Sequence, residues 1–281
     1  MLLAGAAFAL MGVLVKLGAQ WFSSHELVFY RSLVALAVLL LAIAPRRGGG
    51  RHFMGAHTAL HLRRGLIGFL ALATFFYAVA HLPLSVAITL NYASPLFLAL
   101  LMPWQLKERP GRAQYATVAV GFVGVALLLR PWDSAPNDLL AGLVGLVSGV
   151  LAAFAYIHVR RLGRLGEPEW RTVFWFALVA CFGAALLASV DGGWHVAAAV
   201  EHLGLLLGLG LFATLGQLAM TRAYRRGDTV VVAAFAYSTV VFGGMLDTVI
   251  FNMDMPASAW VGMLITVLAG IQAARLTRSG K

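Results

Sequence analysis

The stretch LSVAITLNYASPLFLALLMPW, residues 84–104, carries no charged side chain over a length that suits a membrane-spanning helix. Its centre nevertheless holds Asn91, Tyr92, Ser94 and Pro95. Polar groups are costly in hydrocarbon, and the proline removes a backbone donor and frees the carbonyl of Asn91, four residues earlier. Such groups are tolerated where they face protein or a water-filled cavity. The stretch therefore predicts a spanning helix that lines a polar site.

The composition extends this prediction to the whole chain. Of its 281 residues, 61% are hydrophobic and 11% are charged, whereas soluble domains are about 45–50% apolar and about 25% charged. The apolar residues recur in blocks of about 20 without the alternation of a membrane β-barrel. We therefore predict an all-α integral membrane protein with ten transmembrane helices. The ten predicted spans are residues 2–20, 26–44, 63–82, 85–104, 113–131, 138–158, 170–190, 202–222, 229–250 and 257–275.

The basic residues fall in alternate connections between these spans. All but three of the 21 Lys and Arg lie on one predicted side, and the exceptions are Lys16, Arg31 and Arg130. By the positive-inside rule both termini are expected to be cytoplasmic, in a cell (inner or plasma) membrane. This count places Arg63 and Arg64 in the connection between the second and third spans. Topology accounts for the net charge of +10 and leaves no reason to predict nucleic-acid binding, although contact of the basic connection with acidic lipids is an alternative.

The chain carries an internal repeat. LLAGAAFALMGVLVKLG at 2–18 aligns without gaps onto LLAGLVGLVSGVLAAFA at 139–155, and SVAITLNYASP at 85–95 aligns onto TVVVAAFAYST at 229–239. Each half then holds five spans, and because five is odd the second half enters the membrane inverted. We predict one five-helix repeat at residues 1–131 and an inverted one at 138–276, joined by an external linker at 132–137. Inverted repeats build secondary transporters with a midplane site, although a duplication can also simply enlarge a bundle.

A set of motifs in the first half resembles the EamA-type permeases of the drug/metabolite transporter superfamily. The residues that carry the resemblance are Tyr77, Ala78, Leu82, Pro83, Ala87, Pro95, Leu106, Glu108, Arg109, Gly121, Gly124 and Pro131. It is weaker in the second half, where Thr239 replaces the helix-four proline and Asn252 replaces the glutamate. The resemblance implies ten helices around a central cavity lined by helices one, three, four, six, eight and nine. It also implies transport of amino acids, including aromatic ones, or other small metabolites, often outward.

Charged residues within spans supply the first candidate site residues. Lys16, Arg31 and Asp247 are expected at a similar depth near the external side. They suggest a cationic patch that receives a carboxylate, with Asp247 as its counter-ion or as the group that binds an amine. The alternative is that the two cations reach the interface and that Asp247 ends a helix. Together with Pro95, Asp247 is also a candidate for gating or coupling.

Polar and aromatic residues supply the other candidates. The predicted substrate-binding residues are Lys16, Arg31, Tyr77, Asn91, Tyr92, Ser94, Tyr156, Trp175, Gln217, Phe235 and Tyr237. They follow from polar stripes at helical spacing on the fourth, eighth and ninth spans and from nearby aromatic rings. Hydrogen bonds between helices and ordinary packing are the competing explanations for these stripes.

The function predicted from these features is secondary transport by alternating access. The solute is a small zwitterionic or anionic metabolite, and the protein is expected to act as an exporter or exchanger. A lipid flippase or scramblase and an uptake permease for a nucleoside-like metabolite are the alternatives. No nucleophile elbow or His-Glu-x-x-His helix is present in the sequence, so no enzyme, catalytic residue, metal or cofactor is predicted. A monomer surrounded by lipid is expected, with a dimer as the alternative.

Overall fold

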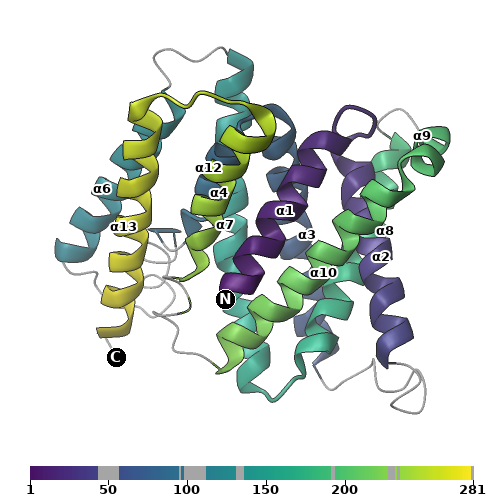
Figure 1. Ribbon diagram of the computed structural model, residues 1–281. Coiled ribbons are helices and arrows are strands. Elements are labelled where there is room, and N and C mark those ends of the chain that lie inside the picture. The colour runs from purple at the N-terminus through teal and green to yellow at the C-terminus, as the bar shows by residue number, and fades with distance from the viewer. Residues whose placement is uncertain are drawn as a thin grey trace.

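The computed structural model describes residues 1–43, 57–94, 96–97, 112–130, 136–190, 194–226, 232 and 235–279, and the regular structure of these residues is helical throughout. The prediction of an all-α chain is confirmed. The helices lie side by side, with both termini toward the lower part of Figure 1 and α9 at its top. In chain order they are α1 (Leu2–Gly18), α2 (Ser24–Ile43), α3 (Thr58–His81), α4 (Leu84–Asn91), α6 (Arg112–Leu129), α7 (Pro136–Arg164), α8 (Glu169–Val190), α9 (Val196–Glu201), α10 (Leu203–Arg226), α12 (Ser238–Phe251) and α13 (Ala257–Ser279).

The helices suit a lipid environment. Among the described residues, α2, α3, α7, α8 and α10 are long and apolar enough to cross a membrane, and α1, α6, α12 and α13 contain shorter apolar helices. Large apolar side chains point outward, such as Phe182 with 71% of its surface exposed and Val190 with 80%. An outer surface of this kind is rare on soluble monomers but matches lipid tails.

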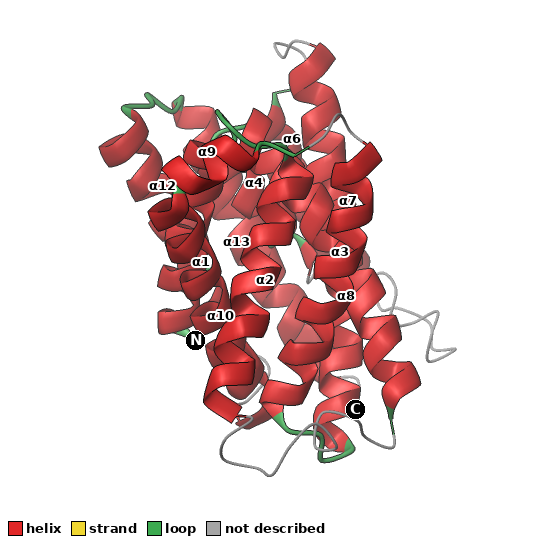
Figure 2. Cartoon of the chain, turned by 90° about the vertical axis from the view of Figure 1, so that its right-hand side faces the viewer, coloured by secondary structure: helices red, strands yellow, loops and turns green. Residues whose placement is uncertain are grey.

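The two halves of the chain interleave. Helix α1 packs against α10 and α12, and α3 packs against α7 and α8. Helix α2 contacts α8 and α10, while α4 contacts α7 and α12. Helices α6 and α13 pair with each other at one edge of the molecule, far from α2 and α8, which lie toward the viewer in Figure 2. The core is therefore formed between helices from different halves.

The α6–α13 pair rests on two glycines. A Cβ atom on Gly262 would lie 2.6 Å from the carbonyl oxygen of Gly124 and 2.7 Å from the backbone nitrogen of Leu128. A Cβ atom on Gly124 would lie 2.9 Å from the carbonyl oxygen of Gly262. The two backbones are thus in direct contact, and small residues permit this kind of helix association in membranes.

Several helices differ from the predicted spans, among them α12, which begins at Ser238 and not at residue 229. Helix α3 begins at Thr58, so Arg63 and Arg64 lie within it and the prediction that they belong to the preceding connection was wrong. Helix α4 ends at Asn91, in the middle of the predicted span 85–104, and residues 98–111 lie outside the described part of the chain. The short helix α9 lies in a connection for which no helix was predicted.

The start of α2 is fixed by a capping box. The backbone N–H of Ser23 donates to the Glu26 carboxylate at 2.9 Å, and the backbone N–H of Glu26 donates to the Ser23 hydroxyl at 3.2 Å. The same carboxylate accepts the backbone N–H of His195 at 2.8 Å and contacts the His195 ring at 2.9 Å. Glu26 therefore ties the segment that leads into α9 onto the start of α2. We call this side of the bundle the α9 end.

The start of α4 is fixed by a residue from the other half. The buried carboxylate of Asp247, on α12, accepts the backbone N–H groups of Leu84 at 3.0 Å and Ser85 at 2.7 Å. It also accepts the Ser85 hydroxyl at 2.6 Å. A carboxylate at a helix N-terminus satisfies otherwise unpaired donors and interacts favourably with the helix dipole. Asp247 thus positions α4, whose other end carries Asn91.

Candidate functional site

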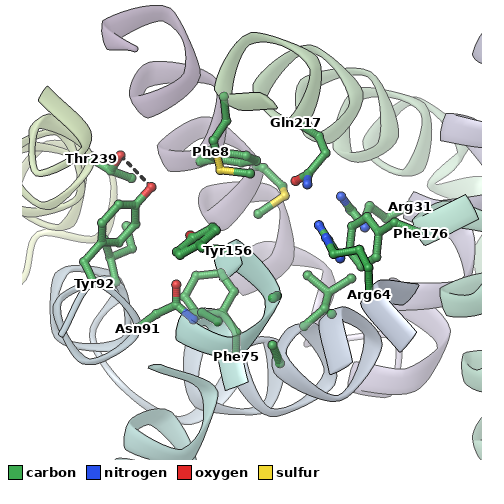
Figure 3. A pocket seen from close by; sticks show the side chains of 18 residues that line it. Phe8, Arg31, Arg64, Phe75, Asn91, Tyr92, Tyr156, Phe176, Gln217 and Thr239 are labelled. Carbon is green, nitrogen blue, oxygen red and sulfur yellow. Dashed lines mark hydrogen bonds between the residues drawn. The ribbon is translucent and has the colours of Figure 1, made fainter. Parts of the chain in front are cut away.

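A cavity of about 100 Å³ lies between the two halves of the chain. Its walls come from α1, α2, α3, α4, α7, α8, α10 and Thr239 of α12. Most of the lining is apolar, with the rings of Phe8, Phe75 and Phe176 among it (Figure 3). The polar lining residues are Arg31, Arg64, Asn91, Tyr92, Tyr156, Gln217 and Thr239. An apolar cavity with a few convergent polar groups is the usual form of a small-molecule site.

One side of this cavity is cationic. Arg31 of α2 and Arg64 of α3 are 2% and 3% exposed. Their guanidinium carbons lie 5.0 Å and 4.3 Å from the centroid of the same ring, that of Phe176 on α8. Figure 3 shows the three side chains together, away from Asn91 and Tyr92. Cation–π contact offsets part of the cost of burying these charges.

The other side of the cavity is neutral and polar. The Asn91 amide donates to the Ser148 hydroxyl at 3.0 Å, and Ser148 in turn donates to the carbonyl of Gly145 at 2.6 Å. The hydroxyl of Thr239 donates to the Tyr92 hydroxyl at 3.1 Å and so connects α12 to the end of α4. The side chains on this wall are therefore held in place by partners on α7 and α12.

The helix that carries Asn91 is interrupted beside the cavity. Tyr92 and Ala93 leave the regular helical pattern, and the N–H of Ala93 bonds to the carbonyl of Leu90 at 3.3 Å, only three residues back. Gly149 of α7 leaves room there, because a Cβ on it would lie 2.6 Å from the Leu90 oxygen and 3.3 Å from the Asn91 oxygen. In the second half of the chain, Tyr237, which aligns with Ala93, is the N-cap of α12. Discontinuous helices of this kind mark the substrate sites of transporters.

The structure brings five of the predicted substrate-binding residues to this cavity. They are Arg31, Asn91, Tyr92, Tyr156 and Gln217. Their role in binding stays a prediction, but they come from α2, α7, α10 and the end of α4 and converge on one space. The predicted depth of Arg31 near Lys16 and Asp247 differs from its observed position, because Arg31 faces Arg64 and Phe176 instead.

The other predicted site residues lie elsewhere. Lys16 donates to the carbonyl of Leu82 at 2.7 Å and lies over the Phe251 ring, near Asp247. Tyr77 stacks on His81, Trp175 stacks on His61, and Phe235 is 49% exposed. Ser94 and Tyr237 are buried, and the Tyr237 ring lies 6.2 Å from that of Tyr92. Pro95 lies outside the described residues.

Comparison with known proteins decides the family. The model of the EamA-like transporter family matches residues 1–130. The pseudopaline exporter CntI of Pseudomonas aeruginosa is 32% identical over 278 residues, which cover 99% of this chain and 95% of that protein. The chain belongs to the EamA-like transporter family. The resemblance to the drug/metabolite transporter superfamily is thereby confirmed, and this EamA-like chain is a multi-pass membrane transporter of that type.

More distant relatives of this EamA-like transporter carry other names. A riboflavin transporter of Vibrio cholerae is 26% identical, with 96% of this chain and 89% of that protein covered. Solute carrier family 35 member G1 of Homo sapiens is 24% identical, with 95% and 75% covered. A solved crystal structure aligns with a TM-score of 0.66 at 18% identity, covering 98% of this chain and 96% of the other. At that identity the likeness concerns the fold alone.

A second cavity of this EamA-like transporter, of about 310 Å³, lies at the end opposite to α9. The rings of Tyr156, which lines the central cavity, and Tyr224, which lines the second one, stack with centroids 5.6 Å apart. Glu167 at its rim contacts Arg171 at 2.6 Å and His61 at 3.3 Å. Burial raises the pKa of the Glu167 carboxyl, but the hydrogen bonds from Arg171 and His61 outweigh it and lower the pKa overall.

Arg64 and Phe176 are among the cavity residues that the sequence reasoning missed. A signal for Arg64 exists in the sequence, because Arg64, Gly68, Ala71 and Phe75 are spaced four, three and four residues apart and so share one helix face. All four line the cavity. The stripe was not recognised because the predicted span began at residue 63 and Arg64 was counted with the connection. Nothing comparable singles out Phe176 among the apolar residues of α8.

Proposed function

We propose that this EamA-like chain is a secondary transporter that moves a small anionic or zwitterionic metabolite by alternating access through the central cavity. The convergence of polar side chains from both halves on that cavity carries the proposal. Export or exchange is the proposed direction, in keeping with the name of the 32% identical pseudopaline exporter. The relatives named as riboflavin transporters support a small organic solute in general.

The pattern of helix contacts supports two inverted five-helix repeats. In the proposed repeats, the counterparts of α1, α2, α3, α4 and α6 are α7, α8, α10, α12 and α13. Exchanging each helix with its counterpart turns the observed contact of α3 with α7 into that of α10 with α1, which is also observed. The same exchange turns the α3–α8 contact into α10–α2 and the α4–α7 contact into α12–α1. The pairs α2–α8, α4–α12 and α6–α13 exchange with themselves, as elements on a pseudo-twofold axis do. A rocking motion of one half against the other would then expose the cavity to each side in turn.

The distribution of exposed charges supports an orientation with both termini in the cytoplasm. At the end opposite to α9, Arg63, Arg160 and Arg161 are exposed. At the α9 end the exposed charges include Asp138, Glu201 and Asp254. We therefore propose that the α9 end is external and that the second cavity opens toward the cytoplasm.

Counterflow in proteoliposomes tests the proposed function. The purified protein should exchange a labelled solute from a panel of acidic, neutral and aromatic amino acids and nucleoside-like metabolites, in a saturable manner. In Asn91→Leu and Arg31→Ala the exchange should fall at least about tenfold, which corresponds to a loss of about 1.4 kcal/mol of binding. Asn137→Leu and Arg63→Ala alter exposed residues of the same types and serve as matched controls.

Wild-type exchange in Asn91→Leu, Arg31→Ala and Gln217→Leu, with each variant folded, would contradict the placement of the substrate in the central cavity. Absence of saturable exchange for every member of the panel would contradict transport of this solute class. Movement of a labelled phospholipid between leaflets, with no exchange of water-soluble solutes, would favour a flippase instead.

A further inference from the structure

The two arginines of the central cavity each bury two donors that have no acceptor among the described residues. In the described part of the chain, Nε and Nη1 of both Arg31 and Arg64 are buried and have no hydrogen-bond acceptor. Buried arginines in proteins are normally paired, because an uncompensated charge in a low-dielectric interior costs several kcal/mol. Phe176 interacts with both guanidinium groups but leaves these donors unsatisfied.

The charges of the site are also unbalanced. Among the described residues that line the cavity there are two arginines and no aspartate or glutamate. Both guanidinium groups lie against the Phe176 ring, which keeps them close to each other. Their positive charges therefore repel one another. A cavity with two uncompensated positive charges is electrostatically complementary to a solute that carries two negative charges.

The surrounding backbone accommodates this arrangement. Gly68 lies one turn beyond Arg64 on α3, and a Cβ atom placed on Gly68 would collide with Nη1 of Arg64 and lie 3.0 Å from the Phe176 ring. The position of the Arg64 guanidinium thus depends on a glycine at residue 68. Each guanidinium is a planar fork that binds one carboxylate through two parallel hydrogen bonds, so two forks match two carboxylates.

We propose that Arg31 and Arg64 form a dicationic clamp that selects solutes bearing two carboxylate groups. The clamp rests on the proposed function, because it specifies the substrate class of the same cavity. The carboxylates bind beside Phe176, and the rest of the solute extends past Tyr156 toward Asn91 and Tyr92, as the layout in Figure 3 allows. Solutes in which an amide replaces a carboxylate are discriminated against, since one guanidinium then stays buried and unpaired.

Binding to the purified full-length protein tests the clamp independently of transport. The probes are three matched pairs: L-aspartate and L-asparagine, L-glutamate and L-glutamine, and succinate and succinamate. Isothermal titration should show at least about tenfold tighter binding of the dicarboxylate in at least one pair. In Arg31→Ala and in Arg64→Ala that preference should disappear, whereas it should persist in Arg63→Ala, an exposed arginine next to Arg64 on the same helix.

Two further variants keep the test valid if an alanine variant does not fold. Gly68→Ala displaces the Arg64 guanidinium without removing its charge and should weaken dicarboxylate binding as Arg64→Ala does. Arg64→Lys keeps the charge but loses the fork, and it should retain only part of the preference. The clamp is overturned if no dicarboxylate binds, if the amide partner or a phosphate monoester binds as tightly in every comparison, or if Arg31→Ala and Arg64→Ala bind dicarboxylates like the wild type.

The clamp and the transport function fail in different ways. Saturable exchange of a neutral amino acid that is unaffected in Arg31→Ala and Arg64→Ala would leave transport standing and remove the clamp. Selective dicarboxylate binding, lost in both variants but without exchange in proteoliposomes, would establish the clamp and remove the proposed transport of these solutes.

Discussion

Replacing Asp247 by alanine is expected to destabilise the folded protein strongly. The carboxylate is fully buried and accepts the first two backbone N–H groups of α4. Without it these donors have no partner in the interior, at a cost of about 1–3 kcal/mol each. The variant should therefore lose about 2–6 kcal/mol and show a markedly lower thermal unfolding midpoint in detergent. Asp247→Asn keeps one acceptor oxygen. Its thermal unfolding midpoint should therefore lie between those of Asp247→Ala and the wild type.

Asp254 supplies the matched control, because it lies in the connection after the same helix and is exposed. Asp254→Ala should unfold at the wild-type temperature. If Asp247→Ala instead unfolds like the wild type but no longer exchanges solute, Asp247 acts in binding or coupling, and its role as the cap of α4 is not needed for stability.

Replacing either cavity arginine by methionine is expected to separate stability from function. Among the described residues, the substrate-free protein buries two cations without an acidic partner at the cavity. Removing one of them removes its desolvation cost and the repulsion between the two. Replacement of buried charged groups by well-packed apolar residues often stabilises proteins by about 1–4 kcal/mol. Arg64→Met should accordingly raise the thermal unfolding midpoint of the substrate-free protein while abolishing exchange of dicarboxylates.

The opposite result identifies a structural role. If Arg31→Met and Arg64→Met both unfold at lower temperature than the wild type, the arginines are paired within the folded protein and hold helices together. Arg63→Met provides the reference, since this side chain is exposed and its replacement should change the midpoint little.

Features that repeat along the chain could be read from the sequence. The apolar blocks and the motifs around Pro83 were sufficient for the all-helical class and the family. The polar centre of residues 84–104 also indicated the cavity, because a membrane helix retains groups such as Asn91 only where something satisfies them. The interruption at Tyr92 and Ala93 was not located to the residue, but Pro95 indicated that the carbonyl of Asn91 has no helical partner.

Features that depend on distant contacts could not be read. Asp247 looked like a counter-ion because its partners, Leu84 and Ser85, lie more than 160 residues away along the chain. Arg64 looked like part of a basic connection because α3 begins without a side-chain hydrogen bond from its N-cap residue, His57, so no capping signal marked its start. Phe176 resembles any other apolar residue of its helix until α2 and α3 place two cations on its ring.

Access to the central cavity from both sides of the membrane is the central claim, and one cysteine measures it. Ala152 of α7 is small, buried and part of the cavity wall, so Ala152→Cys in a Cys181→Ala background places one thiol there. A membrane-impermeant maleimide should label this thiol in right-side-out and in inside-out vesicles, and the transported solute should protect it. Leu211→Cys, on a lipid-facing position, should stay unlabelled. Labelling of Ala152→Cys from one side alone, unchanged by any solute that the protein binds, would contradict alternating access through this cavity.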